Sequence, residues 1–116
     1  MYADPRIPVV FVGATQAASM LRADDAVLVE DGLLIGCDRP VGHFTLGTTA
    51  HVIGCRCCAG RAAPAQALTA MFLARARGEG IFFRRVIAVV HDVGLVRGLL
   101  EDDVVVRARF QVVDQA

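Results

Sequence analysis

Short runs of apolar, mostly β-branched residues, separated by segments with helical spacing, constrain the fold of this chain more than any other feature. Residues 7–12 (IPVVFV), 26–30 (AVLVE) and 85–90 (RVIAVV) are apolar at nearly every position, so both faces of each run would be buried as a strand. Strands of this kind occur in parallel sheets that helices cover on both sides. The sequence therefore predicts one α/β domain over residues 1–116, with a mostly parallel sheet flanked by helices.

Helical segments separate these predicted strands. Residues 62–77 are the clearest helix, because Pro64 suits its first turn and Gly78 follows its last. Residues 15–21 and 93–100 predict two shorter helices.

The remaining segments have weaker signals. Residues 33–37 follow an Asp-Gly turn and predict an antiparallel hairpin partner for 26–30. Residues 38–47 contain a proline and two glycines and predict a loop, and residues 48–53 predict a further strand. Residues 104–113 alternate apolar and polar positions, which is typical of a half-exposed strand.

The basic residues exclude several classes of function. All 12 are arginine, so Schiff-base chemistry on a lysine and phosphate binding by a P-loop lysine are both ruled out. The formal net charge is zero, and we expect neither nucleic acid nor a membrane as a partner. The chain has no uninterrupted apolar run long enough for a transmembrane helix and no signal-peptide pattern, so a cytoplasmic location is expected.

A cluster of cysteines is the strongest chemical signal. Cys55, Cys57 and Cys58 lie in the segment 54–58 (GCRCC), where three thiolates on one loop can converge on a single soft metal ion such as zinc. A structural zinc site usually needs a fourth ligand. The candidates for that ligand are Cys37, His51, His43 and Glu30.

Two other interpretations of the cysteines remain open. Arg56, Arg61 and the start of the following helix would favour thiolates, and thiolates also suit redox chemistry. Cysteine is, in addition, a frequent buried residue with no chemical role. Three cysteines within four residues, next to arginine and glycine, favour metal binding over packing.

This order of segments resembles the CobW family of GTPases and metal chaperones. Members have a Gly-Cys-x-Cys-Cys loop, then a helix and an apolar strand, as residues 54–58, 62–77 and 85–90 do here. Residues 7–9, 26–30, 99–110 and 112–114 are similar to further family segments in the same order. The resemblance covers most of the chain, which would correspond to about the first half of the family's GTPase domain. It also implies a helix at 101–110, and we therefore expect a helix that gives way to a strand over 110–114.

The chain departs from the family at the phosphate-binding loop. The family has Gly-x-x-Gly-x-Gly-Lys-Thr after the first strand, whereas residues 13–19 (GATQAAS) contain one glycine and no lysine. We therefore expect a fold like that of the P-loop NTPases without the P-loop. Bound nucleotide and GTP hydrolysis are not expected, and the chain is not expected to be an ordinary enzyme.

Three polar segments outside the cysteine loop have modest roles in this interpretation. His91 and Asp92 could orient each other for acid–base chemistry, but a loop cap suits them better because no nucleophile motif accompanies them. His43 is expected to face solvent. Residues 101–103 (EDD) resemble an acidic helix end or a solvated turn.

These features predict a metal-binding protein that resembles a metal chaperone, holds zinc or cobalt, and has no GTPase activity. The alternatives are a non-catalytic module that binds proteins or oligomerises, and a small thiol redox protein. A half domain would leave apolar surface and sheet edges uncovered. A second copy of the chain or another protein is therefore the expected partner.

Overall fold

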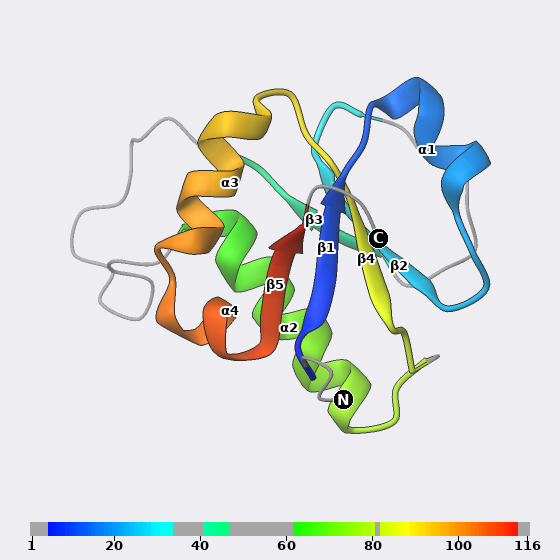
Figure 1. The fold of residues 1–116 in the computed structure, drawn as a ribbon, viewed down its shortest axis with the longest axis vertical. Coiled ribbons are helices and arrows are strands. Elements are labelled where there is room, and N and C mark those ends of the chain that lie inside the picture. The colour runs from blue at the N-terminus through cyan, green and yellow to red at the C-terminus, as the bar shows by residue number, and fades with distance from the viewer. Residues whose placement is uncertain (1–4, 34–40, 47–61, 81, 114–116) are drawn as a thin grey trace.

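The computed structural model describes residues 5–33, 41–46, 62–80 and 82–113 as one α/β domain (Figure 1). Its strands and helices alternate in much the order that the sequence predicts. The strands are β1 Ile7–Phe11, β2 Asp25–Glu30, β3 Val41–Phe44, β4 Arg85–Val89 and β5 Phe110–Val113. The helices are α1 Ala14–Met20, α2 Ala63–Ala76, α3 Val93–Glu101 and α4 Val104–Arg109.

The five strands form one sheet in the order β3-β2-β4-β1-β5. Every neighbouring pair is parallel, with Val9 opposite Val86 between β1 and β4, and Val27 opposite Ile87 between β2 and β4. The predicted fold class is therefore confirmed. The three central strands are the ones whose sequences are apolar on both faces, as burial on both sides requires.

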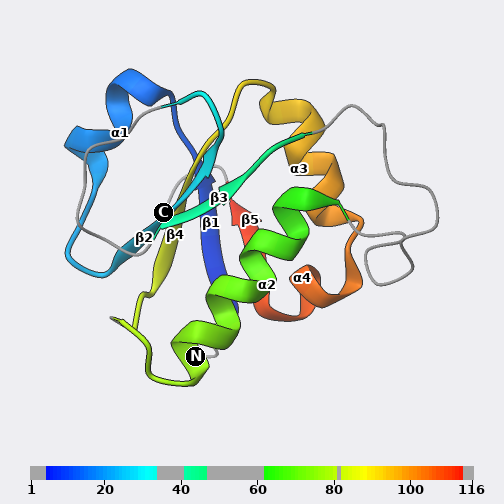
Figure 2. The same ribbon diagram turned by 180° about the vertical axis from the view of Figure 1, so that it is seen from behind.

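The crossovers travel in opposite directions along the sheet, and this places helices on both faces. From β1 to β2 the chain passes across β4 through α1, and from β4 to β5 it passes across β1 through α3 and α4. Right-handed crossovers in opposite directions lie on opposite faces. Val96, Leu100 and Val106 accordingly pack with Leu68 of α2 on one face, and Ala17 of α1 packs on the other. Figure 2 shows α2 lying across the sheet on the first face.

Two aspartates start the last two helices. Asp92 is the N-cap of α3 and accepts a hydrogen bond from the Leu95 amide, 3.0 Å away. Asp103 caps α4 in the same way through the Val106 amide, also 3.0 Å away. These caps satisfy amides that have no partner in the helix. They confirm the capping role predicted for Asp92 and the helix-end position of the acidic run.

The predicted helix-to-strand change near the C-terminus is confirmed. Residues 104–109 form α4, and β5 begins at Phe110, which is buried and pairs with Ile7 of β1. The alternation of apolar and polar residues that begins at Val106 is typical of a strand, but residues 104–109 form a helix. The Asp103 cap and the burial of Val106 against the other helices favour the helix instead.

Two predictions around β3 are wrong. Residues 38–47 were expected to be a loop, but β3 lies within them. Residues 33–37 were expected to pair with β2 as a hairpin. Residues 34–37 lie outside the described residues, but both sides of β2 are occupied by parallel strands, β3 and β4. A four-residue strand that contains a glycine is too short to show a periodic pattern in the sequence. It is stabilised by pairing with β2 and by contact with α2, and these contacts form only in the folded domain. The predicted strand at 48–53 lies outside the described residues.

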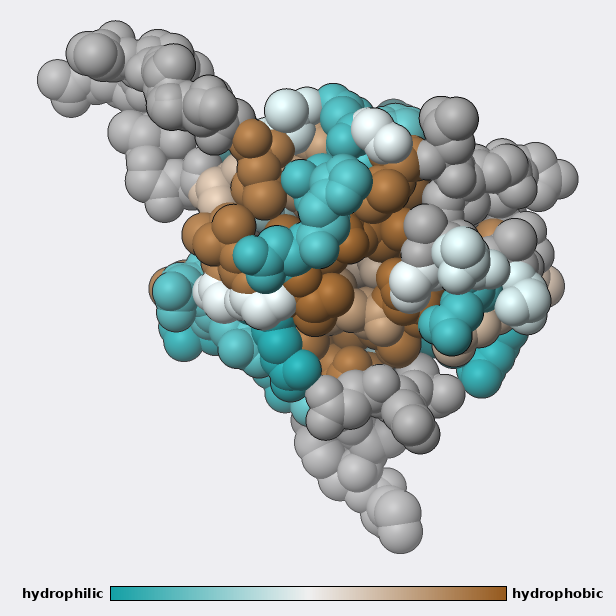
Figure 3. Space-filling model, turned by 90° about the horizontal axis from the view of Figure 1, so that it is seen from above, coloured by the Kyte–Doolittle hydropathy of each residue, from teal (hydrophilic) through white to brown (hydrophobic). Residues whose placement is uncertain are grey.

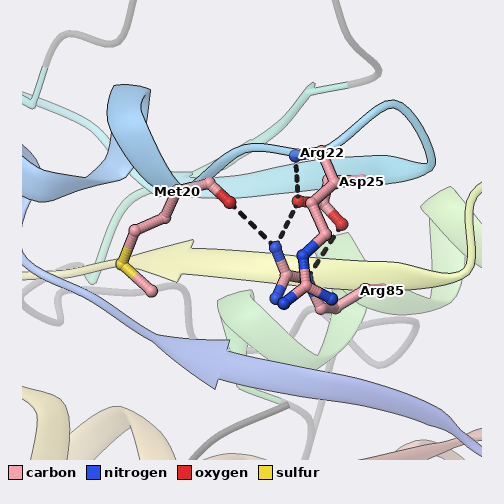
Figure 4. A network of polar contacts seen from close by, with 4 residues as sticks. All are labelled: Met20, Arg22, Asp25 and Arg85. Atoms are coloured by element: carbon pink, nitrogen blue, oxygen red, sulfur yellow. Dashed lines mark hydrogen bonds and ion pairs between the residues drawn. The ribbon is translucent and has the colours of Figure 1, made fainter.

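A buried ion pair joins β2 and β4 at the edge where both strands begin (Figure 4). The Arg85 Nε and Nη2 atoms donate to the two carboxylate oxygens of Asp25, at 2.9 and 2.6 Å. Arg85 Nη2 also donates to the Met20 carbonyl oxygen, and the Arg22 amide donates to Asp25 Oδ2. The side chains are only 7% and 2% exposed. The pair therefore ties the end of α1 to the sheet and satisfies its own buried charges.

Removing one partner of this pair should destabilise the domain strongly. Arg85→Leu leaves the Asp25 carboxylate buried without its cation, and the expected loss of unfolding free energy in urea is about 3–5 kcal/mol. The double variant Asp25→Leu/Arg85→Leu should recover much of that loss, since it leaves no buried charge unpaired. Arg84→Leu removes the adjacent exposed arginine and should cost less than about 1 kcal/mol. Equal losses for Arg84→Leu and Arg85→Leu would contradict this role.

Gly42 of β3 lies directly under α2. A Cβ atom at this position would lie 2.5 Å from Sδ and 3.0 Å from Cγ of Met71. Gly42→Val should therefore destabilise the domain by about 1–3 kcal/mol through overpacking. The same substitution in a Met71→Ala background should cost clearly less, as measured by thermal unfolding. A cost that does not depend on residue 71 would show that the close approach is not the cause.

Candidate functional site

The carboxyl ends of the five parallel strands meet at one edge of the sheet, which we call the carboxyl edge. The opposite edge, where the strands begin, is the amino edge. At the carboxyl edge β1 and β4 are neighbours, but the chain leaves β1 toward α1 on one face and leaves β4 toward α3 on the other. Open α/β sheets bind ligands where neighbouring strands diverge in this way. The carboxyl edge is therefore the candidate functional site.

A hydrogen bond ties the ends of β2 and β4 together at this edge. Glu30 is the last residue of β2, and its Oε1 atom accepts from the amide of His91, two residues after β4, at 2.9 Å. The Glu30 side chain is half-buried, whereas His91 is exposed. A carboxylate held by a backbone amide has a fixed position, so it can serve as an oriented oxygen donor.

A second polar group joins β3 to the turn after β2. Asp31 accepts a hydrogen bond from the Thr45 hydroxyl through Oδ2, and its Oδ1 atom lies 3.9 Å from His43 Nδ1. The Asp31 amide donates to the Phe44 carbonyl oxygen at 2.8 Å. The side chains of His43 and Asp31 are 64% and 54% exposed, so solvent screens their attraction. The exposure of His43 agrees with the prediction that it faces solvent.

The turn after β2 also brings the His91 ring close. Gly32 has a φ of +98°, a conformation that side chains rarely adopt, and a Cβ atom there would lie 3.7 Å from His91 Nε2. Asp92, in contrast, caps α3 by accepting a hydrogen bond from the Leu95 amide. His91 therefore lies beside Glu30 and the Gly32 turn, whereas Asp92 serves as the cap of α3.

Apolar side chains gather in the middle of the carboxyl edge. Figure 3, a view onto this edge, shows them surrounded by hydrophilic ones. Val93 and Leu95, in the first turn of α3, are 43% and 50% exposed. Phe11, Leu33 and Leu46, at or just beyond the ends of β1, β2 and β3, are partly buried. Apolar side chains accompanied by a few polar groups are the usual composition of a ligand site.

Most of the predicted metal ligands lie outside the described residues. Those are Cys37, His51, Cys55, Cys57 and Cys58. Glu30 and His43 are the predicted ligands that the structure places. Glu30 lies at the carboxyl edge with its carboxylate held by the His91 amide, and His43 is exposed on β3. Among the described residues, no group of three or more His, Cys, Asp or Glu side chains is arranged to hold a metal ion. The described part of this edge would therefore need ligands from elsewhere in the chain.

The contact between Asp31 and Thr45 was not predicted from the sequence. Asp31 directly follows a predicted strand, and polar residues at the ends of parallel strands share one edge, so its general location could have been inferred. Thr45 could not have been found in this way, because the prediction had no strand at 41–44. Its contact with Asp31 depends on the pairing of β2 with β3.

Comparisons of the chain with protein-family models, with curated proteins and with solved structures find no match. Within the described residues, no helix has the length and apolar character needed to cross a membrane.

Truncating Glu30 should loosen the end of β4. Glu30→Ala removes the acceptor of the His91 amide, so this amide should exchange with solvent several-fold faster in NMR hydrogen-exchange measurements, at a cost in stability of about 1 kcal/mol. Asp31→Ala is the matched control, because it removes a neighbouring carboxylate that does not contact that amide. Unchanged His91 exchange in Glu30→Ala would contradict the proposed tether.

Proposed function

We propose that this protein binds a transition-metal ion, zinc or cobalt, at the carboxyl edge through Cys55, Cys57 and Cys58. The observation that most supports this is the position of β3. This strand ends at the carboxyl edge, next to the end of β2 that carries Glu30, and the segment with the three cysteines follows it in the chain. The chain therefore enters the cysteine segment from an edge that already carries oxygen and nitrogen donors.

The ligand chemistry is consistent with such an ion. Three thiolates need one more ligand to complete a tetrahedral zinc site, and we propose Cys37, His51 or Glu30. The hydrogen bond from the His91 amide engages Oε1 of Glu30. Ligating carboxylates in proteins are commonly held by such an outer hydrogen bond, which orients them toward the metal.

The proposed role is metal handling without nucleotide hydrolysis. The chain contains no lysine, and residues 13–19 contain a single glycine, so the usual phosphate-binding groups are missing. In the CobW-type proteins that the sequence resembles, nucleotide binding is expected to control metal release. Here release would instead depend on a partner or on thiol exchange.

Metal content tests this proposal. Protein purified without a histidine tag should contain about one zinc per chain by elemental analysis, and a chelator should release it and expose the thiols. The triple variant Cys55→Ser/Cys57→Ser/Cys58→Ser should lose the metal. Single variants Cys37→Ser, His51→Ala and Glu30→Gln should identify the fourth ligand, because only the variant of that residue should lower the affinity, by 10-fold or more (roughly).

Two results would refute metal binding. One is unchanged metal content in the triple variant. The other is a wild-type protein with four reactive thiols that takes up neither zinc nor cobalt. Reversible oxidation of a cysteine with a depressed pKa would then indicate the redox alternative.

A protein-binding module is the second candidate function, and the two outer strands of the sheet, β3 and β5, favour it. In the described residues, β3 and β5 each pair with a strand on one side only. Open edges of this kind can add a strand from another chain. Stability that is unaffected by chelators, together with a stable complex or dimer in sedimentation, would favour this function over metal binding.

A further inference from the structure

Arginine and phenylalanine side chains alternate along a row near the amino edge, where β4 and β5 begin. The Arg75 guanidinium lies 3.6 Å from the centroid of the Phe82 ring and 5.8 Å from that of Phe72. The Arg109 guanidinium lies 4.7 Å from the Phe72 centroid on the other side of the row. We call Phe82, Arg75, Phe72 and Arg109 the Arg–Phe ladder.

The inner part of the ladder holds the fold together. Arg75 Nε donates to the Phe83 carbonyl oxygen at 2.7 Å, which fastens the segment before β4 to the end of α2. The Phe72 ring meets Phe110 of β5 edge-on, with centroids 6.1 Å apart. These contacts place Arg75 and Phe72 in fixed positions. A stacked guanidinium is preorganised for binding, because it loses little further freedom when it pairs with a carboxylate.

The two ends of the ladder are open. Phe82 is 58% exposed, and Arg109 lies exposed at the end of α4. Phe82 is the one aromatic side chain among the exposed large hydrophobic residues of the described chain. The Phe82 ring is stacked against Arg75 and remains accessible, so an apolar side chain of a partner can cover it.

The charge around the ladder is not neutralised within the described part of the chain. Arg75 and Arg109 have no carboxylate partner there, and Arg84 is 3.9 Å from Asp24 in an exposed pair. Burial and the adjacent Arg84 both lower the pKa of Arg75, so its surroundings disfavour the positive charge. A carboxylate placed here would relieve that repulsion and would gain charge-assisted hydrogen bonds.

We propose that the Arg–Phe ladder is a docking site for an acidic segment of a partner protein. Its carboxylates would pair with Arg75 and Arg109, and an apolar side chain would cover Phe82. Single-stranded nucleic acid is disfavoured, since the chain has no net charge and a single exposed ring provides no row of stacking positions. This proposal does not depend on metal binding.

Fluorescence anisotropy with labelled probes tests whether the Arg–Phe ladder binds an acidic peptide. The probes are a short peptide that alternates Glu with Leu, the same peptide with Gln for Glu, and single-stranded oligothymidylate. We expect micromolar binding of the Glu peptide that weakens with salt, and little binding of the other two. Phe82→Ala and Arg109→Gln should each weaken it roughly fivefold or more.

Two matched variants serve as controls. Arg107→Gln removes the same charge from the same helix but outside the ladder, and Leu95→Ala removes a similarly exposed apolar group at the opposite edge. Both should bind the Glu peptide like the wild type. If Phe82→Ala fails to fold, Arg109→Lys replaces it, because this variant keeps the charge but loses the planar stacking group and should also weaken binding.

Four outcomes would overturn the proposal. Absence of binding to the Glu peptide would do so, as would equal losses in Arg107→Gln and Arg109→Gln, which would indicate non-specific attraction. Tighter binding of oligothymidylate would indicate nucleic acid as the ligand. Self-association in sedimentation that Phe82→Ala abolishes would indicate a second copy of the chain.

Discussion

The handedness of the crossovers is the constraint on which the rest of this structure depends. The chain moves toward β3 in its first half and back toward β5 in its second, so right-handed connections place α1 on one face and α2, α3 and α4 on the other. The three central strands become buried on both faces, which their apolar sequences permit. The same reversal makes β1 and β4 neighbours whose outgoing segments diverge, and this divergence creates the candidate site at the carboxyl edge.

The two edges of the sheet have different chemistry for the same reason. At the amino edge the polar groups are mostly fixed by structural contacts, such as the buried Asp25–Arg85 pair and the stacking of Arg75 on Phe82. At the carboxyl edge Glu30 is half-buried, and Asp31, His43 and His91 are exposed. Apolar side chains also gather at this edge (Figure 3). Buried and stacked arginines therefore lie at the amino edge, and carboxylates and histidines accessible to solvent lie at the carboxyl edge. This division is common in parallel α/β folds, where the ends of the strands carry function.

The elements that could be predicted are those whose own residues favour a strand or a helix. The strands β1, β2 and β4 and the helix α2 follow from apolar runs and from proline and glycine signals within each segment. Strand β3 was missed, and a hairpin was predicted next to it, because a short edge strand is stabilised by its neighbours rather than by its own residues. The sequence identified Glu30 as a candidate ligand, but it did not reveal the contacts of Asp31 with His43 and Thr45, which join the turn after β2 to β3.

The sequence by itself determined the class of the fold, the absence of lysine chemistry and the presence of a thiol cluster, because composition and short-range patterns are properties of the chain before it folds. Only the tertiary structure decided that Glu30 lies beside the end of β4, that Arg85 neutralises Asp25, and that Phe82, Arg75, Phe72 and Arg109 form one row. Apart from the Arg75–Phe72 contact within α2, each of these contacts joins residues from different segments of the chain. Their proximity depends on strand order and on the direction of the crossovers, which no local pattern encodes.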